Sequence, residues 1–191
     1  METATDLRNV YSGLKRHIIN PAFDDTVTFV ETCRESGGRQ TSLLITLGPG
    51  GRNDMHTHKT YTETFEPVSG TLMVVLASGK KLLQPGESFT VPIGAAHCFA
   101  NPGTEEITFR CIIKPGHEGF ETGLRILYGL AVDGKSKIDS WETMLKAAVI
   151  LMLSDMRLCG PKALMNPLIP YLYKLAQKRG IEQLLRDKYV I

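Results

Sequence analysis

Short runs of β-branched and aliphatic residues, separated by glycine and proline, occupy the chain from about residue 26 to residue 113. Many of these runs alternate apolar and polar positions, which is the period of a strand with one buried face. Turn-forming pairs such as Gly37-Gly38, Ser69-Gly70 and Pro102-Gly103 lie between them. We therefore expect strands at 26–33, 40–47, 61–68, 72–77, 81–83, 88–91, 97–100 and 105–113. Many short strands at this spacing predict a mainly β antiparallel sandwich or barrel.

Helical patterns flank this β region on both sides. We expect helices at 6–19, 141–158 and 167–178, with a last turn at 181–188. Asp139 or Ser140 can cap the second of these helices, while 120–130 either stay extended or begin a crossover. The pattern divides the chain near residue 120. Residues 1–120 form an N-terminal lead and the barrel, and 121–191 form an α-helical extension packed on the barrel or on a dimer partner.

The composition is typical of a soluble protein with one good core, since the chain has 191 residues, of which 42% are hydrophobic and 22% charged. A net charge of +2 gives no sign of nucleic-acid binding. The charge is uneven, because residues 157–191 carry seven Lys and Arg against two acids, a net of +5 that leaves −3 elsewhere. We interpret this segment as packed helices with solvated cations, and contact with an anionic membrane surface is the alternative.

The cysteines and the N-terminus bear on the compartment. The four cysteines are widely spaced and include no Cys-x-x-Cys pair, which favours free thiols in a reducing compartment. The first nine residues are polar and lack the apolar segment of a signal peptide, and no apolar run is long enough to span a bilayer. We therefore expect a cytoplasmic protein.

Three of the five histidines fall, with a glutamate, in two spaced frames. The first is Gly50-x5-His56-x-His58-x4-Glu63-x6-Gly70, and the second is Gly86-x5-Pro92-x-Gly94-x2-His97-x3-Asn101. On a strand, His56 and His58 share one face, whereas Glu63 needs a bend to face the same way. Three imidazoles and one carboxylate suit one divalent transition metal, which can be Fe, Mn, Zn, Ni, Co or Cu. The frames therefore predict a metal centre inside a barrel.

The two frames resemble the two conserved motifs of the cupin superfamily, and every fixed position of both motifs is present. The gap between them, 71–85, is fifteen residues, as in the small microbial cupins. The resemblance covers about residues 40–115 and implies a double-stranded β-helix (jelly-roll) barrel. It implies metal ligands at His56, His58, Glu63 and His97. It does not name a reaction, because cupins include dioxygenases, isomerases, decarboxylases, hydrolases, ligand-binding proteins and transcription regulators.

Strand alternation places further side chains on the face of the ligands. These residues are Tyr61, Phe65, Met73, Phe89 and Phe99. They either line an apolar cup for a small, partly apolar ligand or simply fill the barrel. Arg110 is either a solvated surface residue or an inward anchor for a substrate carboxylate. Asn101 is expected in a turn, His17 and His117 on the surface or in loops, and Cys98 on the face away from the metal.

These features predict a metal-binding protein, with a metal-dependent oxidoreductase activity of the dioxygenase type on a small, partly apolar molecule. One alternative is a protein that binds or senses a small molecule without turnover, since no second acid or base can be placed beside the metal. Another is an isomerase or epimerase, for which Tyr61 is the only candidate acid or base. A homodimer is expected from the habit of the family.

Overall fold

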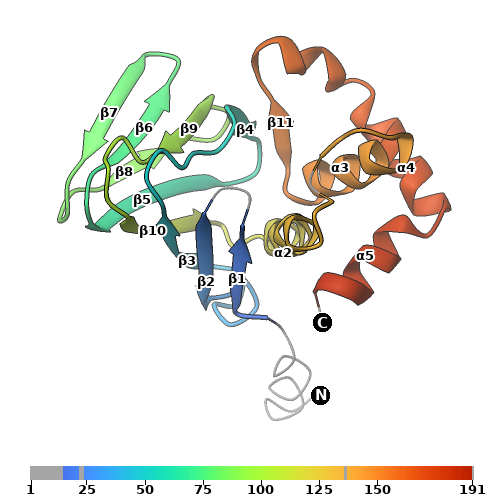
Figure 1. The fold of residues 1–191 in the computed structure, drawn as a ribbon, viewed down its shortest axis with the longest axis horizontal. Coiled ribbons are helices and arrows are strands. Elements are labelled where there is room, and N and C mark those ends of the chain that lie inside the picture. The colour runs from blue at the N-terminus through green and yellow to red at the C-terminus, as the bar shows by residue number, and fades with distance from the viewer. Residues whose placement is uncertain (1–14, 22–23, 136, 191) are drawn as a thin grey trace.

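Two antiparallel sheets face each other and enclose the main core (Figure 1). The computed structural model describes residues 15–21, 24–135 and 137–190. The larger sheet has the order β1 (His17–Asn20), β2 (Asp25–Glu31), β3 (Thr41–Leu47), β10 (Ile107–Lys114), β5 (Thr62–Ser69) and β8 (Phe89–Val91). The smaller sheet has the order β11 (Met156–Leu158), β4 (His56–His58), β9 (His97–Ala100), β6 (Leu72–Leu76) and β7 (Gly79–Leu83). This arrangement confirms the expected mainly β fold of the jelly-roll type.

The space between the sheets is filled by the inward half of each alternating strand. In the larger sheet Phe65 lies opposite Cys111 on one side and Phe89 on the other, so the three side chains share the inner face. The Phe99 ring from the smaller sheet meets the rings of Phe65 and Phe109 edge to face, with centroids 5.8 and 5.2 Å apart. Aromatic pairs of this geometry contribute about 0.5–1.5 kcal/mol beyond the area they bury.

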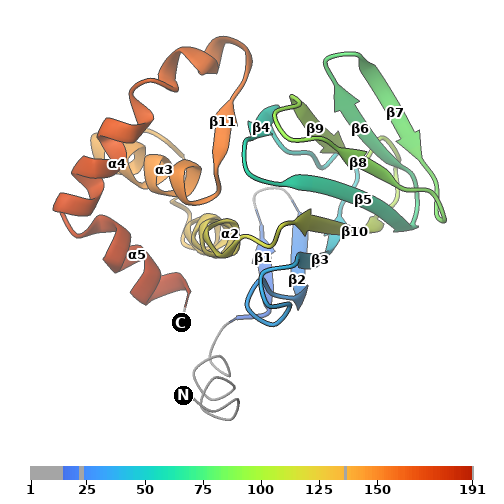
Figure 2. The same cartoon turned by 180° about the vertical axis from the view of Figure 1, so that it is seen from behind.

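The helices lie together beside the two sheets (Figure 2). They are α2 (Glu118–Val132), α3 (Trp141–Leu153), the 3-10 helix η1 (Gly160–Met165), α4 (Ile169–Lys178) and α5 (Ile181–Tyr189). Ile126, Leu145 and Ala176, from α2, α3 and α4, are buried in a second apolar cluster of their own. Ser140 begins α3 with a capping box, in which its side chain accepts from the backbone N–H of Thr143. The predicted division near residue 120 falls within α2 and stays a prediction.

Two predicted helix limits differ from the structure. Residues 120–130 belong to α2, so the extended alternative is wrong. The helix expected to run to about residue 158 ends at Leu153, because Asp155 takes a left-handed conformation (φ 50°) and the chain then enters β11. Of the helix expected at 6–19, residues 1–14 lie outside the described residues, and His17–Asn20 form a strand.

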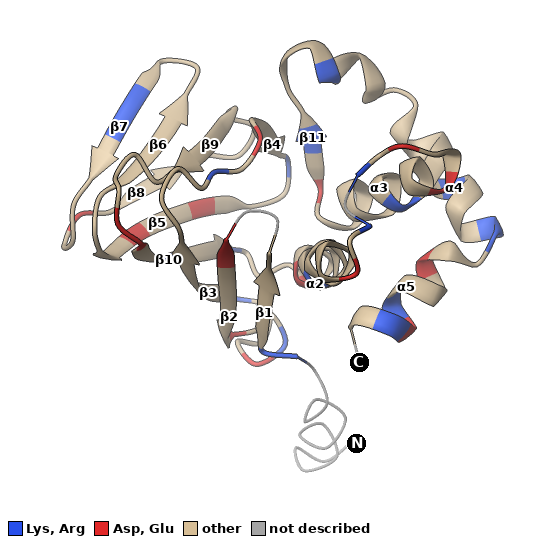
Figure 3. Cartoon of the chain, in the orientation of Figure 1, with Lys and Arg blue, Asp and Glu red and all other residues tan. Residues whose placement is uncertain are grey.

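The cations of the C-terminal segment are spread from β11 through η1 and α4 to α5 (Figure 3). Lys162, Lys174 and Lys178 are exposed to solvent, as the packed-helix interpretation requires. None of the helices within the described residues is long and apolar enough to cross a membrane. Contact of this segment with an anionic membrane surface stays an alternative prediction.

Candidate metal centre

The four predicted ligands converge from both sheets on one buried point. His56 and His58 point inward from β4, His97 points inward from β9, and Glu63 reaches across from β5 in the other sheet. They are 3%, 2%, 1% and 6% exposed, respectively, and one ligand atom from each lies within 4.8 Å of every other. The turn at Lys59-Thr60 carries the chain from one sheet to the other. This turn is the bend that the spacing of Glu63 requires.

All three imidazoles present the same nitrogen to this point. His56 donates from Nδ1 to the carbonyl oxygen of Asp54 (2.6 Å), and His97 donates from Nδ1 to that of Ala95 (3.0 Å), because a carbonyl can only accept. Tyr61 donates its hydroxyl proton to the carbonyl oxygen of Ser154 (2.8 Å), so the contact between Tyr61 Oη and His58 Nδ1 (2.6 Å) runs from the imidazole. In each ring Nε2 is therefore the nitrogen left to bind a metal. His97 Nε2 also lies 2.6 Å from Glu63 Oε2, so a metal bound there would displace the proton shared by this pair.

One atom of the group lacks the partner that a metal would supply. His58 Nε2 is buried and has no hydrogen-bond partner within the described residues. Leaving a buried polar atom unsatisfied costs about 1–3 kcal/mol, so such an atom in a native fold is expected to have a partner, such as an ion or a water molecule. Three imidazole nitrogens and one carboxylate suit Fe, Mn, Co, Ni, Cu and Zn. The residues therefore fit a divalent transition metal, whose identity they leave open.

The charges of the metal-free group suit the same role. Burial lowers the pKa of His58 to about 4 and also lowers the pKa of His56, so both imidazoles are neutral ligands near pH 7. Burial by itself would raise the pKa of Glu63, but the hydrogen bond from His97 and the attraction of the imidazoles when they are protonated lower it to about 2. His97 Nε2 lies 2.6 Å from Glu63 Oε2, a contact that outweighs burial and raises the pKa of His97.

Four of the predicted pocket residues lie in the interior that contains this group. Phe65 lies on the inner face of β5 two residues after Glu63, and Phe89 and Phe99 share that interior. Tyr61 is buried, with its ring stacked on His58 at a centroid distance of 4.3 Å. The predictions for these four residues as pocket walls stay predictions, since the same side chains also pack the core.

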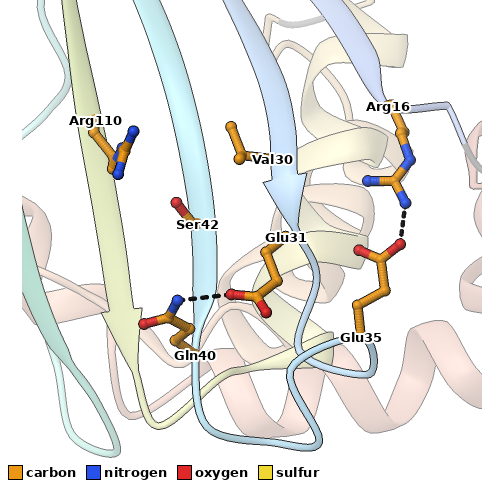
Figure 4. A pocket seen from close by; sticks show the side chains of 7 residues that line it. All are labelled: Arg16, Val30, Glu31, Glu35, Gln40, Ser42 and Arg110. Carbon is orange, nitrogen blue, oxygen red and sulfur yellow. Dashed lines mark hydrogen bonds and ion pairs between the residues drawn. The ribbon is translucent and has the colours of Figure 1, made fainter. Parts of the chain in front are cut away.

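Two predicted pocket residues lie elsewhere, which corrects their assignment. Met73 alternates with the fully buried Leu72 and Val74, and Leu76 rather than Met73 shares the face of His97. Met73 therefore points away from the interior. Arg110 is exposed between the inward Phe109 and Cys111, as the surface alternative anticipated. It borders a surface depression of about 510 Å³ together with Arg16, Val30, Glu31, Glu35, Gln40 and Ser42 (Figure 4).

The remaining polar candidates take mainly structural places. The Asn101 side chain is buried and donates to the carbonyl oxygens of Leu47, Gly48 and Glu105, and it accepts from Gly103 N in the predicted turn. Cys98 pairs with Val75 on the face opposite His97, as expected. His17 is exposed on β1 and contacts Thr28 Oγ1.

Four residues near the group were not predicted from the sequence. Cys111 Sγ lies 4.0 Å from Glu63 Oε1, and strand alternation alone could have placed it inside. His117 caps α2 by accepting from Phe120 N, and its ring lies 5.1 Å from that of Tyr61. Ser154 and Asp155 come from the helical extension, and no local pattern links them to the two frames.

Comparison with known proteins supports the fold. A family model described as a cupin domain matches residues 43–113. A mannose-1-phosphate guanylyltransferase of Escherichia coli is 36% identical over 36% of this chain and 14% of its own length. A germin-like protein of Arabidopsis thaliana is 38% identical over 35% of this chain and 33% of its own. The chain thus spans a third or less of these two relatives.

The solved structures that align with the chain share less sequence with it. A predicted oxalate decarboxylase from Thermotoga maritima aligns with a TM-score of 0.48 and 16% identity, over 55% of this chain and 95% of that one. A sugar phosphate isomerase of a cupin superfamily from Silicibacter pomeroyi aligns with a TM-score of 0.46 and 22% identity, over 54% and 72%. At this similarity the activities of these proteins are not transferred to the chain.

Proposed function

Since the chain belongs to the cupin superfamily, we propose that it holds one divalent transition metal through His56, His58, Glu63 and His97 and acts as a metal-dependent oxidoreductase of the dioxygenase type. The observation that carries the proposal is the convergence of three imidazoles and a carboxylate, including the buried His58 Nε2, which has no hydrogen-bond partner within the described residues. Bound there, the metal would supply Lewis acidity and coordination sites for small oxygen-containing ligands. Three imidazoles and one carboxylate leave two positions of a six-coordinate ion open.

The surroundings of the group favour a small, partly apolar substrate. Phe65, Phe89 and Phe99 bring aromatic rings to the interior that contains the four polar ligands. An apolar wall with one polar centre is the usual composition of a small-molecule site. Tyr61 does not suit the acid or base role that an isomerase requires. Its hydroxyl contacts both His58 and Ser154, and burial raises its pKa further above the usual range.

Oxygen consumption tests the dioxygenase proposal directly. Metal-free protein is loaded anaerobically with Fe(II) and supplied with catechols, flavonols, thiols or diketones in an oxygen-electrode cell. We expect oxygen uptake that depends on one of these classes and on bound iron. Protein with His58→Ala, treated in the same way, provides the blank. Full iron loading without oxygen uptake in the presence of any of these substrate classes would contradict the dioxygenase proposal.

A second candidate function is binding or sensing of a small molecule without turnover. It is favoured by the same engagement of Tyr61, because the hydroxyl that could serve as an acid or base beside the metal ligands is already held in two hydrogen bonds. A ligand that raises the melting temperature of the metal-loaded protein and is recovered unchanged would support this candidate.

A homodimer and a cytoplasmic location stay predictions.

A further inference from the structure

The helical extension reaches the outer side of the metal ligands through hydrogen bonds and strand pairing. β11, which follows α3, pairs with β4 so that Met156 lies opposite His58 and Leu158 opposite His56 (Figure 1). We infer that the extension is a positioning element for the proposed metal site, acting through Tyr61, Ser154 and Asp155 to orient His58. The inference rests on the proposed metal binding and adds a role for residues outside the cupin motifs.

The first link joins His58 to the end of α3. His58 donates from Nδ1 to Tyr61 Oη (2.6 Å), and Tyr61 in turn donates to the backbone carbonyl of Ser154 (2.8 Å). Ser154 is 3% exposed and Tyr61 is 1% exposed, so water does not compete for these bonds. An acceptor on the Nδ1 side of a ligating histidine fixes the tautomer and the ring orientation and raises the basicity of Nε2. The chain Ser154–Tyr61–His58 therefore sets how Nε2 meets a metal.

The second link fixes the turn that separates His58 from Tyr61. Asp155 Oδ2 accepts from Lys59 N (2.7 Å) and from Thr60 Oγ1 (2.8 Å). Asp155 is held at the head of β11 with a positive φ of 50°, a conformation that Asp tolerates better than most residues. One carboxylate oxygen thus ties the extension to the two residues of the turn. The turn also leads into β5, the strand that contains Glu63, and so affects where the Glu63 carboxylate lies.

A third contact between the same segments supplies a control. Lys162 Nζ in η1 lies 2.7 Å from Asp54 Oδ2, and the Asp54 carbonyl oxygen accepts from His56 Nδ1. The two charged side chains are 65% and 77% exposed, and an exposed ion pair contributes little. The backbone oxygen of Asp54 can accept the hydrogen bond from His56 without this ion pair. Lys162 therefore joins the extension to the segment before β4, but it does not orient any of the proposed metal ligands.

Metal affinity of four proteins tests the inference. Wild type, Tyr61→Phe, Asp155→Asn and Lys162→Ala are stripped of metal and titrated with Co(II), whose visible absorption reports the ligand geometry. Tyr61→Phe removes the acceptor for His58 Nδ1, and we expect roughly 10–100-fold weaker binding and an altered spectrum. Asp155→Asn keeps a neutral acceptor and is expected to weaken binding less. Lys162→Ala is expected to stay within about twofold of wild type.

The possible results distinguish a failure of the positioning role from a failure of the proposed metal binding. Unfolding by urea is followed for each metal-free variant, so that a general loss of structure is distinguished from a specific loss of affinity. Should Tyr61→Phe fail to fold, the Co(II) affinity of Asp155→Asn is used to test the inference instead. Wild-type affinity and spectrum in a folded Tyr61→Phe or Asp155→Asn protein would overturn the inference alone. Failure of the wild type to bind Co(II) would overturn the proposed metal site as well.

Discussion

Replacing His58 by alanine is expected to remove most of the bound metal and to leave the barrel folded. The substitution deletes the buried Nε2 that has no hydrogen-bond partner within the described residues, and with it one of the four proposed donors to the ion. Three remaining donors hold a transition metal less tightly, and the lost ring also leaves a cavity beside Tyr61. Elemental analysis of purified protein measures the metal content, and circular dichroism reports the fold.

The matched control for His58→Ala is His17→Ala, which removes an exposed imidazole from β1. We expect full metal content in this control. The metal-free forms of His58→Ala and wild type should differ by about 1–3 kcal/mol in the free energy of unfolding, the usual range for one buried side chain. Metal-loaded wild type should gain further stability, because a ligand that binds only the native state stabilises it. Unchanged metal stoichiometry in His58→Ala would refute its assignment as a ligand.

The sequence was sufficient, for physical reasons, to predict the barrel and the four side chains that converge inside it. Alternation of apolar and polar residues is a local property, and it located β2, β3 and the strands from β5 to β10 within a few residues. β4 was not among the expected strands. The two frames combine ligand types with turn residues at fixed intervals. Some motif positions also require glycine for reasons of backbone conformation. Gly70 has a φ of 74°, and a Cβ there would lie 2.3 Å from Ile107 Cγ2.

The sequence was insufficient where pairing between distant segments decides the outcome. Alternation predicts that Met73 and Leu72 face opposite ways, but only the register of β6 with β9 shows which of them faces His97. β11 is three residues long and follows a helix, so its strand character depends on the edge offered by β4. Ser154 contributes a backbone carbonyl, for which any residue would serve. Such contacts have no sequence signature.

Replacing Gly119 by alanine is expected to destabilise the protein by about 1–3 kcal/mol, although the same change in an exposed helix normally stabilises it by about 0.5–1 kcal/mol. Gly119 lies in the first turn of α2, where a Cβ would stand 2.3 Å from the backbone oxygen of Leu153. A backbone carbonyl cannot rotate away as a flexible side chain does. The end of α3 must therefore shift, and Ser154, the next residue, accepts the hydrogen bond of Tyr61.

Equilibrium unfolding in urea measures this effect, with Gly103→Ala as the matched control. A Cβ at Gly103 would meet its nearest atom, Asn101 Oδ1, at 3.4 Å, so we expect little change there. Gly119→Ala should also weaken Co(II) binding, because the shift moves the acceptor on which the orientation of His58 depends. A Gly119→Ala protein at least as stable as wild type would contradict the close packing of α2 against the end of α3. Lower stability with unchanged metal affinity would instead mean that this shift does not reach the ligands. The two measurements on one variant therefore distinguish how tightly the extension is packed from how strongly it controls the metal centre.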